Sequence, residues 1–239
     1  MFNERIVVLM LCSSDYREPE IKGVEYIYCS SYSNNFCVPF ELSVFDPDDC
    51  KKLISEKFSD VDIMFIIPDI YNCFLASMIA KEAKAAGILT LGFLDIFPCY
   101  KCEGIQKLKN FYDAIFIGSN ANEIINRISS LITKNGYVNL DFQDIKTVLR
   151  GSGIAGYSAG YFGGYNRTRN AAVQAISGVR GKPKRVLVNI TSGSEITLTE
   201  MSDAVKAIQD TADSEAQVIW GHVIDESLSD AVRVSIICS

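Results

Sequence analysis

The chain has 239 residues, a formal net charge of −6 at pH 7 and hydrophobic side chains at 48% of its positions. The acidic balance argues against a nucleic acid as the main partner, since phosphate binding depends on clustered Lys and Arg. No window holds the ~18 uninterrupted apolar residues that a membrane-spanning helix needs, so we expect a cytoplasmic protein without direct membrane insertion.

The first half alternates short strand-like runs with helical patterns. The runs are β-branched or aromatic and are bounded by turn residues, which is typical of buried strands. Between them, residues 48–58 open with acidic side chains and residues 74–87 repeat apolar positions before a terminal glycine, so both segments predict helices. This alternation predicts an α/β fold with a Rossmann-like, mostly parallel sheet. The predicted strands cover residues 5–11, 23–30, 40–45, 61–67, 88–94 and 113–118.

The second half begins with a long predicted helix over residues 121–134, where Ile and Leu recur at spacings of three and four. A second helix at about 141–150 and a smaller α/β unit with a mixed sheet follow it. We expect a degenerate nucleotide-binding-type domain over 1–120, the central helix and its following loop over 121–140, and a C-terminal domain over 141–239. The remaining predicted segments are a Gly- and Tyr-rich strand pair at 153–165, helices at 166–177 and 199–212, and strands at 185–191, 216–224 and 231–238.

The cysteines and the histidine argue against a metal or redox site. Eight cysteines in a chain of this length are too sparse for a disulfide framework. Cys99 and Cys102 form a lone C-x-x-C without a second pair, and we interpret them as free thiols. The single His222 lies in a predicted strand without a partner, which argues against a histidine-based triad or metal site.

A phosphate cradle is missing from the two turns where a parallel α/β domain would have one. Such cradles need glycines, because the backbone N–H groups must approach the phosphate closely. The turn after the first predicted strand reads CSSDYREPEIKG (12–23), and the turn after residue 67 reads PDIYNCFLAS (68–77). Bulky side chains close the second turn, and Asp15, Glu18 and Asp69 would repel phosphate.

The C-terminal segments carry a resemblance to FtsZ, the bacterial tubulin homologue. GYVNLDFQDIKTVL (136–149) is similar to that family's synergy loop, and PKRVLVNITSG (183–193) and VIDESLSDAVRVSIICS (223–239) are similar to its last strands. The N-terminal half resembles the family more faintly and has neither the GGxGxN nor the GGGTGTG turn. The resemblance implies a tubulin/FtsZ-like fold and a filament-related role in cell division, in a divergent, shortened member lacking the glycine-rich GTP-binding motifs. Because the chain ends where the folded core of the family ends, we expect no disordered tail.

The same resemblance implies the candidate site residues. In the family, the synergy loop of one subunit enters the nucleotide pocket of the next, where acidic side chains help to polarise the water that attacks the γ-phosphate. Residue by residue, this catalytic role in trans falls on Asn139, Asp141 and Asp144. From the residues alone, two Asp at a spacing of three share one helix face and can both reach a water or a metal-bound phosphate. The alternative is ordinary helix-start chemistry, with Asp141 as the N-cap and Asp144 in the first turn.

Three functions stay open at this point. The first is a pseudo-GTPase without a cofactor or metal of its own, which caps or regulates filaments of FtsZ or FtsZ-like subunits and completes a neighbour's GTPase site without being an enzyme by itself. The second is a nucleotide-independent scaffold that assembles as a homo-oligomer. The third is a divergent FtsZ that still binds and hydrolyses GTP, or that binds another small molecule, in a remodelled cleft where Ser13 and Ser14 donate to a phosphate.

Overall fold

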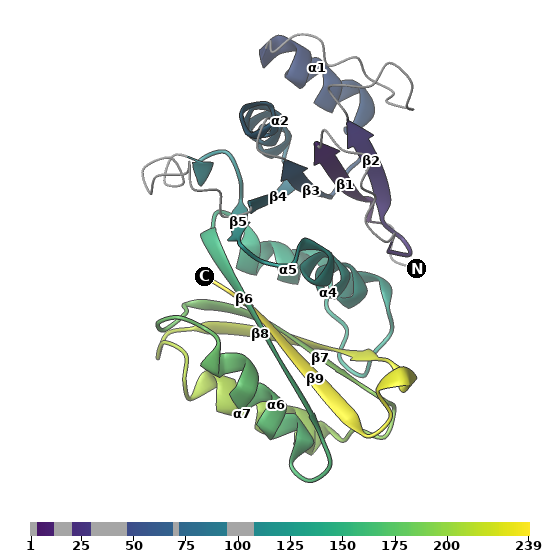
Figure 1. Ribbon diagram of the computed structural model, residues 1–239, viewed down its shortest axis with the longest axis vertical. Helices are drawn as coiled ribbons and strands as arrows, with labels where there is room; N and C mark the ends of the chain where they lie inside the picture. Colours follow the sequence, from purple (N-terminus) through teal and green to yellow (C-terminus); the bar gives the residue numbers. More distant parts are fainter. Residues whose placement is uncertain (1–3, 12–20, 30–46, 69–71, 95–107) are drawn as a thin grey trace. The chain divides into compact units, whose positions relative to one another are not determined.

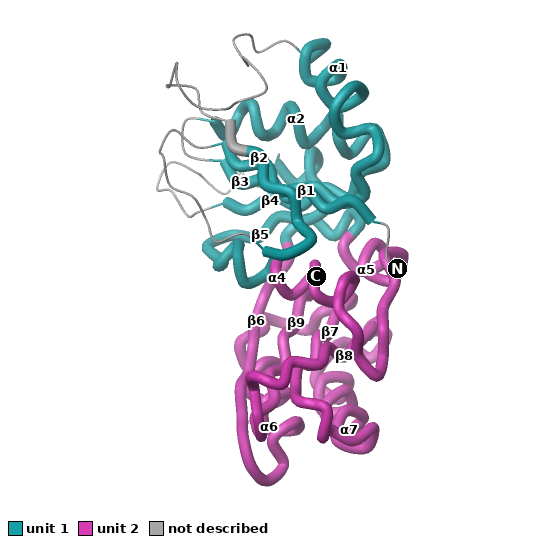
Figure 2. Tube along the Cα trace, turned by 90° about the vertical axis from the view of Figure 1, so that its right-hand side faces the viewer, with its two compact units in different colours: residues 1–125, 150–154 teal, residues 126–149, 155–239 magenta. Residues whose placement is uncertain are grey.

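The computed structural model describes 4–11, 21–29, 47–68, 72–94 and 108–239 (Figure 1). The predicted strand at 40–45 lies outside the described residues, as does most of the turn after the first strand. The side chains that we singled out at 13–15, 18, 69–71, 99 and 102 also lie outside them. The chain divides into two compact units, residues 1–125 with 150–154 and residues 126–149 with 155–239 (Figure 2).

The first unit contains, in its described part, β1 (Ile6–Leu11), β2 (Glu25–Cys29), α1 (Pro47–Lys57), β3 (Ile63–Pro68), α2 (Cys73–Ala85), β4 (Leu89–Leu94) and β5 (Ala114–Ile117). Its strands are all parallel, in the order β2-β1-β3-β4-β5. Helices α1 and α2 pack together on one face of this sheet, and their apolar side chains form one buried core with those of the strands (Figure 1). Burial on the sheet faces explains why the strands read as nearly continuous apolar runs.

A buried carboxylate ties residues 150–154 to the first unit. Asp113 is only 1% exposed, and its side chain accepts hydrogen bonds from the N–H groups of Thr90 (3.1 Å) and Gly151 (3.2 Å). The ammonium group of Lys84 lies 3.8 Å from the same carboxylate. A buried charge needs such partners because desolvation would otherwise be costly.

The second unit takes up most of α4 (Ala121–Thr133) and of β6 (Gly153–Gly163), together with α5 (Phe142–Leu149), α6 (Arg167–Ser177), β7 (Arg185–Ser192), α7 (Leu198–Gln209), β8 (Gln217–Ile224), a 3₁₀ turn (Glu226–Leu228) and β9 (Ala231–Cys238). Its sheet is mixed, in the order β6-β9-β7-β8, because β7 and β8 are parallel and β9 is antiparallel to both of its neighbours. Helices α6 and α7 pack against each other and cover one face of the sheet, whereas α4 and α5 lie on the opposite face (Figure 1).

The expected α/β architecture, with a parallel N-terminal sheet and a mixed C-terminal sheet, is confirmed. One element was predicted wrongly: the segment 153–165 contains a single strand, β6 (Gly153–Gly163), and not a strand pair. One glycine of this strand serves close packing. A Cβ at Gly160 would lie 2.0 Å from the carbonyl oxygen of Ala171, so the absent side chain lets α6 approach the strand.

No helix among the described residues combines the length and the apolar character that crossing a membrane requires. Within the same part of the chain, no three His, Cys, Asp or Glu side chains gather where they could hold a metal ion.

Candidate functional site

The three candidate residues lie near one another in the second unit, where α4 leads into α5. Asn139 and Asp141 belong to the connecting segment, residues 134–141, which we call the α4–α5 loop, and Asp144 lies in the first turn of α5. Asn139 and Asp141 are exposed and Asp144 is half-buried. All three side chains are therefore accessible from solvent.

The two aspartates form a reciprocal cap at the start of α5. The N–H of Asp144 donates to Oδ1 of Asp141 (2.9 Å), and the N–H of Asp141 donates to Oδ2 of Asp144 (3.0 Å). This is the arrangement of a capping box, in which each side chain satisfies a backbone donor that the helix leaves unpaired. Each carboxylate uses one oxygen in the cap and has a second oxygen with which to accept a hydrogen bond.

Asn139 shapes the loop before the cap. Its side-chain Oδ1 accepts a hydrogen bond from the N–H of Gly136 (2.9 Å), which closes a tight turn within the loop. Asn is well suited to such local bonds because its short amide reaches neighbouring backbone groups. In this structure the amide therefore organises the loop that carries Asp141.

The loop also pairs with the outer edge of β8. The N–H of His222 donates to the carbonyl oxygen of Val138 (2.8 Å), and the N–H of Ile224 donates to that of Asn135 (3.2 Å). Loop and strand approach so closely that a Cβ at Gly136 would lie 1.7 Å from the carbonyl oxygen of His222. Only glycine fits this position without displacing the backbone.

Side chains join the loop to the sheet as well. The ring of Tyr137 stacks on that of His222, with centroids 5.3 Å apart and planes inclined by 7°. The N–H of Tyr137 donates to Nδ1 of His222 (3.2 Å), and its phenol donates to the carbonyl oxygen of Ser194 (2.8 Å). On the far side of the imidazole, Nε2 lies 2.9 Å from the hydroxyl of Ser192.

Carboxylates of the β8–β9 connection support this arrangement. Glu226 accepts a hydrogen bond from the N–H of Ser194 (3.2 Å), the residue whose carbonyl holds the Tyr137 phenol. The hydrogen bond from Ser227 lowers the pKa of Asp225, with smaller contributions from the positive charges of Lys134 and Arg127. The α4–α5 loop thus lies beside the Asp225 carboxylate, whose lowered pKa keeps it ionised at neutral pH.

Sequence reasoning missed Tyr137, His222 and Ser192 as parts of this site. Tyr137 and His222 are 85 positions apart, and no local pattern joins them. One signal was present: Gly221 interrupts an apolar strand, and a glycine there often marks a close approach by another segment. A Cβ at Gly221 would lie 2.8 Å from Cγ of Leu140, the last loop residue before the cap.

In the first unit, the place where a parallel sheet usually binds ligands lies between β1 and β3. The strand order reverses there, and such sites form outside the C-terminal strand ends. Asn72 is 6% exposed, and its Nδ2 donates a hydrogen bond to the carbonyl oxygen of Leu11 at the end of β1 (3.4 Å). The first turn of α2 continues with Cys73, Phe74 and Leu75, so its start contains no glycine.

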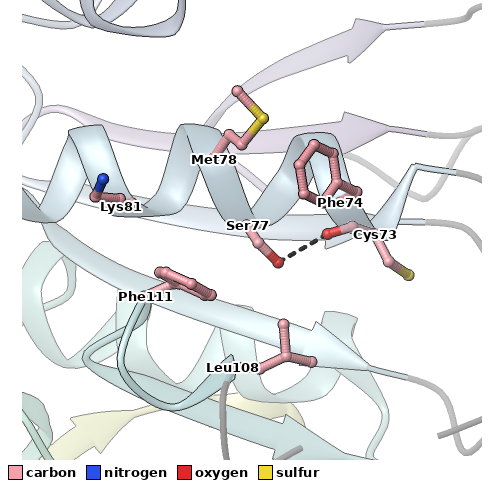
Figure 3. A pocket seen from close by; sticks show the side chains of 7 residues that line it. All are labelled: Cys73, Phe74, Ser77, Met78, Lys81, Leu108 and Phe111. Carbon is pink, nitrogen blue, oxygen red and sulfur yellow. Dashed lines mark hydrogen bonds between the residues drawn. The ribbon is translucent and has the colours of Figure 1, made fainter. Parts of the chain in front are cut away.

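An apolar pocket of about 420 Å³ lies along α2 beside residues 108–111 (Figure 3). Within it, the hydroxyl of Ser77 donates to the carbonyl oxygen of Cys73 (2.8 Å), and Phe74 is 69% exposed. Among the described lining residues Lys81 alone is charged, so the pocket suits an apolar group better than a phosphate. Its lining consists of Cys73, Phe74, Ser77, Met78, Lys81, Leu108 and Phe111.

Comparison with known proteins gives consistent matches. Residues 153–239 match the C-terminal domain of the FtsZ family. The cell division protein FtsZ of Coxiella burnetii is 32% identical over 203 residues, which cover 68% of this chain and 52% of that protein. The FtsZ of Caulobacter vibrioides is 31% identical over 204 residues, which cover 69% of this chain and 40% of that protein. The chain therefore spans about half the length of these curated relatives.

Solved structures agree with the fold. An empty FtsZ dimer from M. jannaschii matches with a TM-score of 0.75 at 18% identity, covering 99% of this chain and 88% of that one. The GDP-bound CetZ1 monomer from Haloferax volcanii matches with a TM-score of 0.56 at 15% identity, covering 81% of this chain and 71% of that one. At these identities the likeness concerns the fold, which is the tubulin/FtsZ-like one expected from the sequence.

Proposed function

Because the chain belongs to the FtsZ family of cell-division proteins, we propose that it acts on FtsZ-type subunits as a pseudo-GTPase. It binds no GTP itself, and its α4–α5 loop completes the nucleotide site of a neighbouring subunit. An active site divided between two subunits can lose one half in a given chain while it keeps the other.

The observation that carries this proposal is the contrast between the α4–α5 loop and the C-terminal ends of β1 and β3, the place where the family's nucleotide would bind. The α4–α5 loop is held by backbone pairing, by a stacked ring and by a reciprocal cap, and it exposes Asp141 beside Asp144. At the C-terminal ends of β1 and β3, the buried side chain of Asn72 donates a hydrogen bond to the end of β1, and apolar side chains follow where the family has glycines. A phosphate needs backbone N–H groups that it can approach, and bulky side chains at a helix start keep it away.

The capped aspartates retain the chemistry that the role requires. A carboxylate that spends one oxygen on the helix start can accept a hydrogen bond from a water with the other. Accepting that bond draws the proton away from the water and makes its oxygen a better nucleophile toward a γ-phosphate. The cap adds precision, because it holds the side chains before any partner arrives.

Filament capping follows from the same contrast. A subunit that offers the loop but no nucleotide joins one end of a filament and completes the last GTP site. It presents no nucleotide to the next subunit, so growth stops at that end. The expected activity is regulation of filament length and of GTP turnover at sub-stoichiometric amounts.

The test adds the chain, at a small fraction of the subunit concentration, to a polymerising FtsZ while light scattering and phosphate release are followed. We expect reduced scattering and altered turnover. Asp141→Asn retains an N-cap acceptor but removes the charge, so it should keep the effect on scattering and lose at least half of the effect on turnover. Asp141→Ala removes both the cap and the charge and should cost about 1 kcal/mol of stability in addition.

Two controls make the outcome decisive. Glu215→Gln removes an exposed carboxylate just before β8 and should behave like the unchanged chain. Electron microscopy of the chain alone separates the proposal from the self-assembling scaffold, which would form filaments without a partner. Unaltered scattering and turnover with every FtsZ tested would contradict the proposed function.

A further inference from the structure

The buried His222 joins the sheet of the second unit to the α4–α5 loop. Its side chain is 1% exposed, and both ring nitrogens have partners from other segments of the chain. A backbone N–H can only donate, so the bond from Tyr137 requires a lone pair on Nδ1. The neutral ring therefore carries its proton on Nε2 and donates it to the hydroxyl of Ser192.

The hydroxyl of Ser192 completes a consistent chain of donors and acceptors. It donates to the carbonyl oxygen of Gly193 (2.9 Å), which leaves its oxygen free to accept from Nε2–H of His222. With this tautomer of the neutral imidazole, both ring nitrogens of His222 and the hydroxyl of Ser192 have hydrogen-bond partners. A fully satisfied buried network holds its members in one arrangement.

We propose that His222 is a positioning residue: its neutral imidazole holds the α4–α5 loop, and protonation of the ring releases the loop. A second ring proton would sit on Nδ1 and face the N–H of Tyr137, so that two donors would meet at 3.2 Å. The ring would also become a buried cation stacked on Tyr137, beside Ser192 and Gly193, which offer it no negative charge.

In the described part of the chain, the hydrogen-bond and stacking partners of the ring carry no carboxylate or amine. From the loop, Tyr137 stacks on the ring of His222. From β7, Ser192 lies at Nε2, and Ile190 pairs with His222 in the β7–β8 ladder. Farther along the β8 chain, Asp225 and Glu226 are engaged with Ser227 and with the N–H of Ser194. Accordingly, burial alone lowers the pKa of His222 from its ordinary value.

The sign of the pH effect follows from this lowered pKa. The neutral ring, and with it the anchored loop, persists at and above the ordinary histidine pKa of about 6.5. The anchoring is lost as the pH falls through the lower pKa of the folded state. Where the chain completes a partner's GTP site, which rests on the proposed function above, its contribution to turnover should fall over the same pH range.

The test begins with the isolated full chain, without any partner. NMR follows the ring protons of His222 and the amide of Tyr137 from pH 7.5 downward, and hydrogen exchange of that amide is corrected for its intrinsic pH dependence. We expect the ring and the amide to titrate together, with exchange about tenfold faster once the ring is charged, because the hydrogen bond to Nδ1 is lost. A Tyr137 amide that does not respond while His222 titrates would overturn the inference.

Variants separate positioning from simple packing. His222→Asn places an amide oxygen near the position of Nδ1 and does not titrate, so it should keep the Tyr137 amide protected and abolish its pH response. His222→Ala should leave that amide unprotected at every pH. Tyr137→Phe retains the backbone N–H and the stacked ring, loses only the bond to Ser194, and should keep the pH response. If His222→Asn loses protection as fully as His222→Ala, the acceptor at Nδ1 is not what holds the loop.

The two proposals fail in different ways. If the loop responds to pH as described but no FtsZ partner responds at any pH, the proposed function is wrong and the role of His222 stands. If the chain changes turnover of a partner equally with His222 and with the Asn variant at every pH, the proposed function stands and His222 does not control the loop.

Discussion

At the residue scale, glycines allow the α4–α5 loop and the sheet to meet. Gly136 lies against the carbonyl of His222, and Gly221 lies against Leu140, so each side of the contact lacks a side chain where the other side approaches. Such pairs of close approaches suit glycine because any Cβ would overlap backbone or packed side chains. The loop carrying Asp141 is therefore positioned by absent side chains as much as by hydrogen bonds.

Replacing Gly136 with Ala should displace the loop from β8, because the added Cβ would lie 1.7 Å from the backbone carbonyl oxygen of His222. We expect the free energy of unfolding to fall by about 1 to 3 kcal/mol, measured by urea denaturation. Gly163→Ala is the matched control, since its Cβ would meet Ala231 at an ordinary 3.9 Å. Equal stability of the two variants would show that the loop adapts without cost.

At the element scale, two helices of the second unit begin with the same device. Helix α5 starts with the Asp141 and Asp144 box, and α7 starts with a box in which Thr197 accepts from the N–H of Glu200 (3.2 Å) and Glu200 accepts from the N–H of Thr197 (3.0 Å). Arg167 extends the second box through its ion pair with Glu200 (3.1 Å). These reciprocal bonds satisfy helix N–H groups that would otherwise have no partner.

The α7 box predicts a pH-dependent contribution to stability. Burial favours the protonated form of Glu200, but hydrogen bonds from Thr197 and Arg167 outweigh it and lower the pKa from 4.5. The contribution is therefore complete above pH 4.5 and is lost as the pH falls through the lower pKa of the folded state. Glu200→Gln should be less stable than the unchanged chain at pH 7, and the difference should shrink below pH 4.5. Thr197→Ala should cost about 1 kcal/mol at pH 7.

Urea denaturation at a series of pH values checks both variants. Lys206→Gln, a change late in the same helix and away from its start, serves as the control and should follow the unchanged chain across the acid range. A constant difference between Glu200→Gln and the unchanged chain from neutral to acid pH would contradict the assigned role of the carboxylate.

At the scale of the whole molecule, each of the two compact units has, among its described residues, an apolar core of its own. One core joins α1 and α2 to the parallel sheet, and the other joins α6 and α7 to the mixed sheet. The two regions compared above belong to different units: the C-terminal ends of β1 and β3 belong to the first, and the α4–α5 loop belongs to the second. Two units with their own cores can diverge separately, because changes in one leave the packing of the other intact.

Calorimetric titration of the chain with GTP and with GDP, in the presence of Mg²⁺, tests this division. We expect no binding heat at micromolar nucleotide, since the start of α2 offers apolar side chains where a phosphate needs backbone donors. A full-length FtsZ such as that of Coxiella burnetii, titrated in the same buffer, is the positive control. Binding of either nucleotide with a micromolar Kd would contradict the pseudo-GTPase proposal and favour a divergent GTPase.

The local sequence pattern predicted most of the described elements and offered the cap as one of two interpretations of the aspartates. Helix α4 follows from its Ile and Leu spacing, the buried strands from their apolar runs, and the cap from two Asp three positions apart at a helix start, because burial periodicity and helix-end hydrogen bonds depend on near neighbours. Tertiary structure alone decided that β6 is one strand and that Tyr137 meets His222. Strand order brings positions 85 residues apart to one edge of the sheet. No short stretch of sequence indicates a contact between residues so far apart, so the contact of Tyr137 with His222 could be found only in the folded chain.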